Sequence, residues 1–265
     1  MSKVSAAQLH YLAGIRRHKR IVRTARLLIL VLFLLLWELS ARLCLINSFI
    51  FSSPCRIIRT FTEMAADGSI FRHVGITLSE TLASFFLVIL IGIAFAVLLW
   101  LFDRLSEILE PYLVVLNSLP KSALAPLLIV WLGANMRTII VAGISVAVFG
   151  TIINLYTGFK EVDPDMLKLI YTLGGNRKDA LIRVVLPANI PILISTSKVN
   201  IGLSLVGVVI GEFIGARQGL GYLIIYGSQV FKLDWVIMSI LILCMIAMVL
   251  YSLISLLEKK YLRRV

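Results

Sequence analysis

The chain has 265 residues, of which 60% are hydrophobic and only 15% are charged. Soluble globular proteins are about 45–50% apolar and about 25% charged, so a water-soluble fold would have to expose much of this apolar surface. The formal net charge of +12 does not indicate nucleic-acid binding, because the lysines and arginines cluster between apolar runs, as they do in membrane proteins. The composition therefore predicts an all-α protein that spans a membrane.

The N-terminal stretch predicts a basic arm followed by a first membrane span. Residues 1–26 contain seven lysines and arginines and no acidic residue, so we expect this arm in the cytoplasm, against anionic lipid. An apolar run follows at residues 27–46, and a helix needs about 20 residues to cross the bilayer. No A-x-A-like site follows this run, which predicts a retained span rather than a cleaved signal peptide. Within the span, Glu38 and Arg42 share one helix face and are expected to form an ion pair.

The segment between the first two spans predicts an amphipathic helix. Ser53-Pro54 is a typical helix start, apolar residues then recur at helical spacing among charged ones, and Asp67-Gly68 ends the pattern. Such a helix is expected at the outer membrane interface. The second span is predicted at residues 77–101, and a short charged loop at 102–110.

Prolines interrupt the third predicted span, at residues 111–132. Pro111, Pro120 and Pro126 lie within it. Each proline removes a helix hydrogen bond, and a membrane tolerates this only where neighbouring protein or a water-filled cavity satisfies the freed backbone groups. The fourth span, at residues 137–159, contains no proline.

The C-terminal part contributes two further spans. The fifth, at residues 188–213, leads into glycines at every fourth position, which is typical of a face for close helix packing. These packing residues are Gly207, Gly211 and Gly215. A polar segment at 215–234 and a sixth span at 235–257 follow. The predicted organisation is an arm at 1–26, a six-span domain at 27–257 and a basic tail at 258–265.

The distribution of basic residues predicts the orientation. With the N-terminus inside, the cytoplasmic segments hold 17 lysines and arginines and the outer segments hold 7. The two remaining ones, Lys121 and Lys198, lie within spans. Because cytoplasmic loops carry the excess of positive charge, both termini and the segment 160–187 are predicted to be cytoplasmic.

This cytoplasmic segment predicts two capped helices around a glycine turn. Asp163-Pro164 supplies a good N-cap and first residue for a helix that runs to about Leu173. Gly174-Gly175 supplies the positive-φ stop. Asn176 can cap a second helix, which Leu186-Pro187 is expected to end.

The first of these two helices carries an apolar stripe. The stripe consists of Met166, Leu167, Leu169, Ile170 and Leu173. A short helix of this kind is suited to docking sideways into a groove of a partner protein.

The spacing after the glycine turn resembles a known signature. Permeases of ATP-binding-cassette (ABC) importers carry Glu-Ala-Ala, three residues, Gly, nine residues and then Ile-x-Leu-Pro in a cytoplasmic segment. Here nine residues separate Gly174 from Val184-Val185-Leu186-Pro187. The Glu-Ala-Ala position holds Lys168-Leu169-Ile170 instead, which leaves open whether the contact with the ATPase is ionic.

The resemblance extends over nearly the whole chain and is nearest to the nitrate, sulfonate and taurine branch of these permeases. It rests on six motifs in the same order, LWELSARL, SSPCRIIRTF, LNSLPKSALAPLLIVWLG, VDPDML, RVVLPANIP and GEFIGARQGLGYLI. Two positions depart from the pattern: Glu80 stands where a basic residue is common, and Ser84 where glycine is common.

The resemblance implies a type I ABC importer permease of about six transmembrane helices in the bacterial plasma (inner) membrane. It also implies a second permease copy, two cytoplasmic ATPases that bind ATP and Mg²⁺, and an external solute-binding protein. This chain would then hold no cofactor and perform no catalysis, and its substrate would be a small solute, such as an organic sulfonate or nitrate. Whether the permease pair is a homodimer or a heterodimer stays open. The residues expected to couple to the ATPase are Asp163, Pro164, Asp165, Met166, Leu167, Lys168, Leu169, Ile170, Leu173, Gly174, Leu186 and Pro187.

The two intramembrane lysines are candidates for a translocation pathway. A lysine in a span is costly and is a functional candidate by default, and Lys121 and Lys198 lie on the two most polar spans. The hypothetical pathway residues are Asn117, Ser118, Pro120, Lys121, Ser122, Thr196, Lys198 and Asn200. In the alternative, Lys121 bonds carbonyls freed by Pro120, and Lys198 snorkels or pairs with a neighbouring span.

No motif for catalysis or metal binding is present. The sequence lacks the phosphate-binding pattern G-x-x-x-x-G-K-[ST], and its three histidines and three cysteines show no metal-ligand spacing. Cys44 and Cys55 could pair or stay free, and Glu212 could meet the binding protein or pair with Arg217. The alternative functions are a secondary transporter or channel, for which we find no inverted repeat, and an assembly protein without transport.

Overall fold

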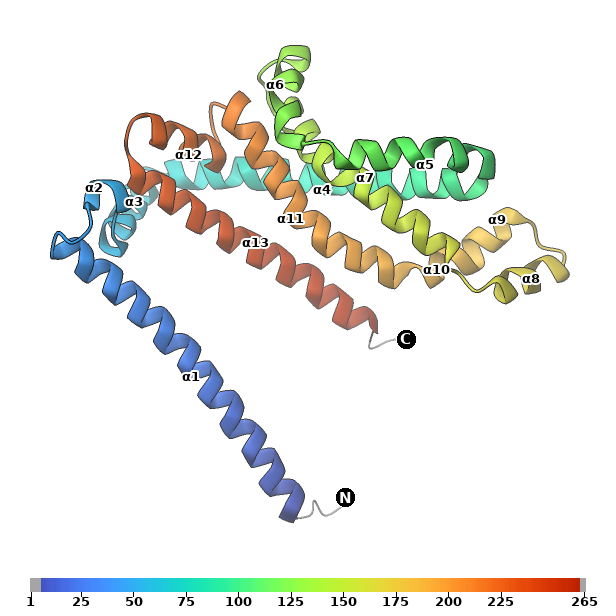
Figure 1. Cartoon of the computed structure of the whole chain (residues 1–265), viewed down its shortest axis with the longest axis horizontal. Helices are drawn as coiled ribbons and strands as arrows, with labels where there is room; N and C mark the ends of the chain where they lie inside the picture. The colour runs from blue at the N-terminus through green and yellow to red at the C-terminus, as the bar shows by residue number, and fades with distance from the viewer. Residues whose placement is uncertain (1–5, 263–265) are drawn as a thin grey trace. The chain divides into compact units, whose positions relative to one another are not determined.

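A computed structural model describes residues 6–262. Residues 1–5 and 263–265, which include Lys3 of the predicted arm and Arg263 and Arg264 of the tail, lie outside the described part. The described chain is built from helices, without strands (Figure 1). Five of its helices are long and apolar enough to cross a membrane, or six if one bent pair counts as a span. The chain divides into two compact units, Met1–Glu63 and Met64–Val265.

The first unit holds α1 (Ala6–Arg42), α2 (Ser48–Phe51) and most of α3 (Pro54–Ala66). The helix α1 begins before the predicted first span, since it is helical through most of the arm, and it ends at Arg42, short of the predicted bound at residue 46. Its apolar part runs from Arg20 to Arg42. The expected ion pair is confirmed, with 2.8 Å between Arg42 Nε and Glu38 Oε1. The second Glu38 oxygen accepts a hydrogen bond from the Cys55 amide at 3.1 Å, so this glutamate ties the end of α1 to the start of α3. Cys44 and Cys55 are exposed free thiols.

The second unit begins with a helix pair and a broken span. α4 (Ser69–Leu101) starts eight residues before the predicted span. The predicted loop at 102–110 is wrong, because α5 (Asp103–Ser118) begins there. The third span is not continuous either: α5 and α6 (Lys121–Leu132) meet at an angle of 96°. The cause is local, since Leu119 before Pro120 is extended, with ψ 139°, as the proline ring requires.

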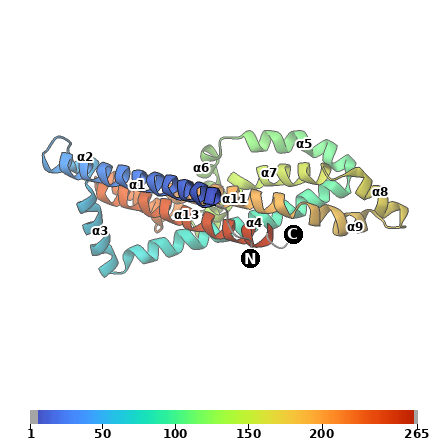
Figure 2. The ribbon, with the colours of Figure 1, turned by 90° about the horizontal axis from the view of Figure 1, so that it is seen from below.

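The remaining elements follow α7 (Met136–Lys160), which agrees with the predicted fourth span. They are α8 (Pro164–Thr172), α9 (Arg177–Ala180), the π-helix η1 (Leu181–Val185), α10 (Leu186–Ala188), α11 (Ile190–Gly215), α12 (Leu220–Gln229) and α13 (Leu233–Leu262). In both views α8 and α9 lie together at one end of this unit (Figures 1 and 2), whereas α12 lies toward the other end in Figure 1.

The expected helix end at Leu186-Pro187 is wrong. The chain stays helical to Ala188 because the π-helix η1 precedes the proline. Pro187 has no amide hydrogen to donate to the carbonyl four residues back. In η1 the bonding shifts by one residue, so that the Leu186 amide donates to the Leu181 carbonyl.

The centre of the second unit is the packing of α7 against α4 and α11. The buried core includes Val88, Ile152, Leu155 and Val208. Glycines set the closest approach: a Cβ atom added to Gly207 would lie 2.8 Å from the Gly143 Cα on α7. A Cβ at Gly211 would lie 3.1 Å from the Ile139 Cα, and one at Gly215 would lie 2.9 Å from the Ile129 side chain. This glycine face of α11 therefore lies directly against backbone and side chains of neighbouring helices.

Candidate functional site

The candidate coupling element is α8, and its ends form as the caps predict. The Asp163 carboxylate accepts a hydrogen bond from the Asp165 amide at 2.9 Å, and Pro164 occupies the first turn. Gly174 ends the helix with φ +82°, a conformation that costs an L-residue about 1–2 kcal/mol. Asn176 and Asp179 then form a capping box at the start of α9. Local hydrogen bonds thus define both helices and the turn between them.

The predicted apolar stripe divides between two faces of α8. Leu167 and Ile170 are partly buried and pack against the hydrophobic core of the unit. Met166, Leu169 and Leu173 are 54%, 59% and 75% exposed. The first two residues anchor the helix to its own chain, whereas the other three form an outward apolar face, because positions three and four apart share one side of a helix.

Charge on α8 is satisfied locally. Lys168 occupies the position where permeases with the Glu-Ala-Ala signature have an acid. Its Nζ atom lies 2.8 Å from Asp165 Oδ1. Both side chains are about three-quarters exposed, so this pair contributes little to stability. The outward face of α8 is therefore apolar at its centre, with a compensated charge pair beside it.

Arg177, at the start of α9, clamps the candidate element to the end of α4 and the start of α5. Its two terminal nitrogens bond the Asp103 carboxylate at 2.9 and 2.6 Å, and one of them also donates to the Trp100 carbonyl at 2.6 Å. The guanidinium lies 5.2 Å from the centroid of the Trp100 ring, within cation–π range. The hydrogen bonds with Asp103 raise the pKa of Arg177 above its ordinary value. Arg177 was not among the predicted site residues, because nothing local in the sequence pairs it with an aspartate 74 positions earlier.

A cleft of about 440 Å³ opens beside this clamp. Its walls come from α4, α5, α7, α8 and α9 and combine aromatic rings with acidic side chains. They include Trp100, Tyr156, Tyr171, Glu107, Glu110 and Lys160. The cleft and the outward face of α8 lie at the same end of the second unit, so one partner could contact both.

The two predicted pathway lysines have partners within the chain, and these partners are on different elements. The Lys121 ammonium bonds the Leu116 carbonyl, the carbonyl that Pro120 leaves without its helix donor, and lies 5.1 Å from the Phe149 ring centroid. Lys198 on α11 pairs with Glu258 on α13. Both arrangements match the structural alternative, and the pathway role of the two lysines stays a prediction.

The other predicted pathway residues also separate into two groups. Thr196 and Asn200 are buried, and the Asn200 amide donates to the Thr151 hydroxyl on α7 at 2.8 Å. Asn117, Ser118 and Ser122 lie near the break between α5 and α6, where the Ser118 hydroxyl bonds the Val114 carbonyl at 2.9 Å. Within one chain, no described hydrogen bond or ion pair joins the two groups.

A second polar cluster lies where α4, α11 and α12 meet. Glu212, which is 1% exposed, does not pair with Arg217 as one alternative proposed. It accepts hydrogen bonds from the Thr77 hydroxyl at 2.6 Å and from the Gly221 amide at 2.5 Å. The His73 Nδ1 atom accepts from the Gly219 amide at 2.9 Å. These bonds hold loop 216–219 and the start of α12 against α4.

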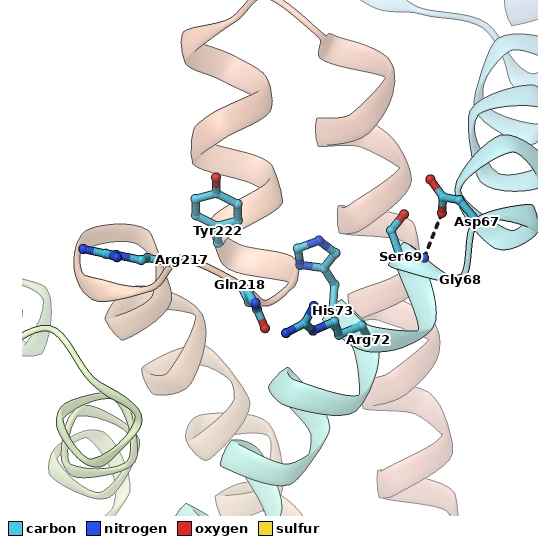
Figure 3. A pocket seen from close by; sticks show the side chains of 8 residues that line it. All are labelled: Asp67, Gly68, Ser69, Arg72, His73, Arg217, Gln218 and Tyr222. Carbon is cyan, nitrogen blue, oxygen red and sulfur yellow. Dashed lines mark hydrogen bonds between the residues drawn. The ribbon is translucent and has the colours of Figure 1, made fainter.

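Beside this cluster is a cleft of about 410 Å³. Figure 3 shows His73 and Arg72 of α4 near Gln218 and Tyr222, with Asp67 and Ser69 at its other side. The His73 and Tyr222 rings are stacked with centroids 6.2 Å apart. Hydrogen bonds from Ser69 lower the pKa of the Asp67 carboxyl. This cleft is basic on balance, in contrast to the cleft beside α8.

Residues 88–264 match the family described as "Binding-protein-dependent transport system inner membrane component". The chain belongs to this family. As a member it is a multi-pass inner-membrane protein and the permease subunit of an ABC importer. The family assignment favours the predicted importer over a secondary transporter, a channel or an assembly protein.

Individual relatives agree with this assignment. The permease is 31% identical over 228 residues to a probable ABC transporter permease protein of Haemophilus influenzae, covering 85% of this chain and 91% of the relative. It is 26% identical to the putative aliphatic sulfonates transport permease protein SsuC of Bacillus subtilis, over 89% and 86% of the two chains. It is 28% identical to the riboflavin transport system permease protein RibX of Chloroflexus aurantiacus, over 88% and 87%.

The fold of the permease is also found in a solved transporter. The inward-facing MetNI methionine ABC transporter contains a chain that superposes with a TM-score of 0.63 and 19% identity. The match covers 76% of this permease and 97% of that chain. At this identity the likeness supports the shared helical architecture, which confirms the predicted fold class.

Proposed function

We propose that this permease subunit imports a small organic solute and that α8 is the element through which a separate cytoplasmic ATPase drives it. Family membership already implies an ATPase and a solute-binding protein as partners. The proposal adds the contact surface, the orientation and the class of solute. In this orientation the α8–α9 end and both termini face the cytoplasm, in agreement with the excess of basic residues there.

The observation that carries the proposal is the outward face of α8. Three large apolar side chains, Met166, Leu169 and Leu173, are more than half exposed on a helix that is capped at its start and ended by a positive-φ glycine. Full burial of a Leu or Met side chain stabilises by about 1.5–3 kcal/mol. A preorganised helix with such a face is suited to a groove on a partner, because little conformational entropy is lost on docking.

The proposed mechanism assigns mechanical work to this chain and ATP chemistry to the partner. ATP and Mg²⁺ bind on the ATPase, and closure of two ATPases moves the docked α8 helices. Arg177 transmits that motion to α4 and α5 through its bonds with Asp103 and Trp100. The α7–α11 pair, held at glycine contacts, moves as a rigid body and exposes the pathway alternately to each side.

The proposed assembly contains two copies of this permease, and the proposed solute is a small organic anion. The relative SsuC, named for aliphatic sulfonates, supports the anion. The relative RibX, named for riboflavin, shows that chains of similar identity are assigned different solutes, so the solute-binding protein is the expected site of selection. Within the chain the charge of Lys198 is compensated by Glu258, whereas Lys121 bonds a neutral carbonyl and keeps its net positive charge.

The test is co-purification of the full-length permease with candidate ATPases after substitution of the outward face. Leu169→Asp places a charge at the centre of this face and should reduce ATPase capture at least tenfold, because a buried unpaired charge costs far more than the lost apolar contact. Lys178→Asp is the control, since it introduces the same residue, with a larger change of charge, at an exposed position of α9. Equal capture by wild type and Leu169→Asp would refute the docking role of α8.

A further inference from the structure

Two glutamate side chains meet inside the second unit without a cation between them. Glu80 on α4 is 2% exposed and Glu212 on α11 is 1% exposed. Thr77, one turn before Glu80 on α4, donates to Glu212 at 2.6 Å, so the two carboxyl groups lie within hydrogen-bonding reach of each other. Two carboxylates have no hydrogen to share, so a direct bond between two carboxyl groups requires that one of them is protonated.

The hydrogen bonds around the pair identify which carboxyl is ionised. The Leu220 amide donates to the Thr77 hydroxyl at 2.8 Å, and this hydroxyl in turn gives its single hydrogen to Glu212 Oε1 at 2.6 Å. The Gly221 amide donates to Glu212 Oε2 at 2.5 Å, and the Tyr222 amide also bonds this carboxyl. Both Glu212 oxygens therefore act as acceptors, an arrangement that stabilises the ionised form of this carboxyl.

Glu80 has the opposite environment. Its Oε2 atom is buried without a hydrogen-bond partner, and the charged neighbour of its carboxyl group is Glu212. Within the described chain, neither glutamate forms an ion pair with a lysine, arginine or histidine. Nothing stabilises a second negative charge here, whereas a protonated Glu80 supplies the hydrogen that the bond to Glu212 needs.

The elements packed around the pair are α4, α7, α11 and α12. The titratable side chains that they bring nearest are His73 on α4, whose Nδ1 atom accepts from Gly219, and Tyr222 on α12, whose ring stacks on His73. On α7 the surface against Gly211 is apolar, formed by Ile139 and Ala142. Arg72 and Arg217 line the neighbouring cleft and are exposed.

We infer that Glu80 and Glu212 form a proton-binding site, in which Glu80 holds the proton and Glu212 the negative charge, and that this proton fastens the Gly219–Tyr222 segment to α4. Loss of the proton places two adjacent carboxylates in a buried site. Their repulsion separates Glu212 from Glu80, and the Thr77, Gly221 and Tyr222 bonds to Glu212 are lost with it. The site needs no partner protein, so it stands whether or not the proposed importer function is correct.

The glycines of this segment belong to the same site. A Cβ atom at Gly221 would lie 2.7 Å from Glu212 Oε2, and one at Gly219, which has φ +114°, would collide with the same carboxyl. Backbone amides reach Glu212 only because side chains are absent at these two positions. The turn is thus shaped around an ionised carboxylate.

The test uses the full-length chain in lipid nanodiscs and compares wild type with Glu80→Gln, Glu80→Lys and Glu212→Gln. Infrared spectra should show a protonated-carboxyl band near neutral pH that both Glu80 variants lack. Glu107→Gln, an identical substitution at an exposed position of α5, is the control and should leave the band unchanged. A wild-type band that persists in both Glu80 variants overturns the inference.

Amide hydrogen exchange of residues 219–222 is the second readout. Wild type and Glu80→Gln should exchange equally at low pH, because glutamine donates the same bond without a titrating proton. As the pH rises, the ratio of wild-type to Glu80→Gln exchange should increase by up to about tenfold per pH unit, since opening then releases one proton. Dividing by the Glu80→Gln rate cancels the intrinsic pH dependence of exchange.

The two glutamates should also respond differently to the same change. Glu80→Gln and Glu80→Lys should fold and keep the segment protected, because an amide or a cation can replace the protonated acid beside Glu212. Glu212→Gln should lose protection at every pH or fail to fold, because its amide NH2 group must face one of the two donors, the Thr77 hydroxyl or the Gly221 amide. A flat exchange ratio, failure of both Glu80 variants to fold, or equal tolerance of Gln at both positions overturns the inference.

Discussion

Arg177→Ala should loosen the α8–α9 end from α4 and α5 without unfolding the membrane helices. The substitution removes a bidentate pair with Asp103, a hydrogen bond to the Trp100 carbonyl and a cation–π contact with the Trp100 ring. The side chains of Arg177 and Asp103 are 42% and 72% exposed, so the pair is screened and contributes about 0.2–1 kcal/mol. The carbonyl bond adds about 0.5–1.5 kcal/mol, and the ring contact about 0.5–1 kcal/mol.

The expected loss is therefore about 1–3 kcal/mol, because such contributions are not fully additive. One factor of ten corresponds to about 1.4 kcal/mol, so amide exchange in 164–180 should accelerate about 5- to 150-fold, where exchange proceeds by local opening. Arg177→Lys keeps the charge but loses the planar fork and should fall between wild type and alanine. Lys178→Ala, on the next exposed residue, is the control and should exchange like wild type.

A double substitution separates the contribution of the Arg177–Asp103 ion pair from that of the Trp100 contacts. Asp103→Asn removes the charge partner but leaves the Trp100 contacts, so it should accelerate exchange less than Arg177→Ala does. Combined with Arg177→Ala it should add almost nothing, because the pair is already absent. Unchanged exchange of 164–180 in Arg177→Ala, measured in nanodiscs, would show that buried apolar residues such as Leu167, Ile170 and Ala180 hold α8 and α9 without the clamp. The clamp argument would then be wrong.

Three further substitutions test the packing and the buried pairs. Gly207→Ala places a methyl group 2.8 Å from the Gly143 Cα and should destabilise by about 1–3 kcal/mol in thermal unfolding, whereas Gly202→Ala, with nothing within 4 Å, should be neutral. Thr151→Val leaves the buried Asn200 amide without its hydrogen-bond acceptor and should lower the free energy of unfolding by about 1–3 kcal/mol. Adding Asn200→Leu should recover most of that stability. Lys198→Met leaves Glu258 without its partner at a partly buried site and should cost somewhat less than the about 3–5 kcal/mol of a fully buried pair. Adding Glu258→Gln should restore both stability and uptake, and stable protein without uptake would instead assign Lys198 to the pathway.

Local signals explain most of what could be predicted from the sequence. Caps act over two or three residues, so Asp163 and Asn176 predict the starts of α8 and α9, and both caps are present. Apolar runs of about 20 residues predict spans, which the five long apolar helices confirm. The errors at the starts of α1 and α4 have a common cause, since both helices begin in polar turns, where the hydrophobic pattern stops but the hydrogen-bond ladder does not.

Long-range pairing could not be predicted in the same way. Lys198 and Glu258 are 60 positions apart, and either could have met lipid headgroups instead. The division of the α8 stripe depends on which side of the helix meets the core, and this is a property of the packed unit, not of the helix sequence. For the role of Glu212 the sequence offers one signal, namely the two glycines that follow it closely, Gly219 and Gly221. Glycines spaced this way after a buried acid are consistent with backbone amides that bind the carboxylate.

A glycine turn joins α8 to α9, and from α9 onward the connection to the membrane helices is helical. α9, η1 and α10 follow one another directly and lead through Asn189 into α11. Ala180 and Val185 are fully buried in the core, so this connector is fixed at two points along its length. At its far end the Asn189 amide donates to the Val185 carbonyl at 2.9 Å, and a Cβ atom at Gly158 on α7 would lie 2.5 Å from the Asn189 Oδ1 atom. Interfaces packed this closely shift as units rather than deform gradually. We therefore expect a movement of α9 to shift α7 and α11 together, as the proposed coupling to an ATPase through α8 requires.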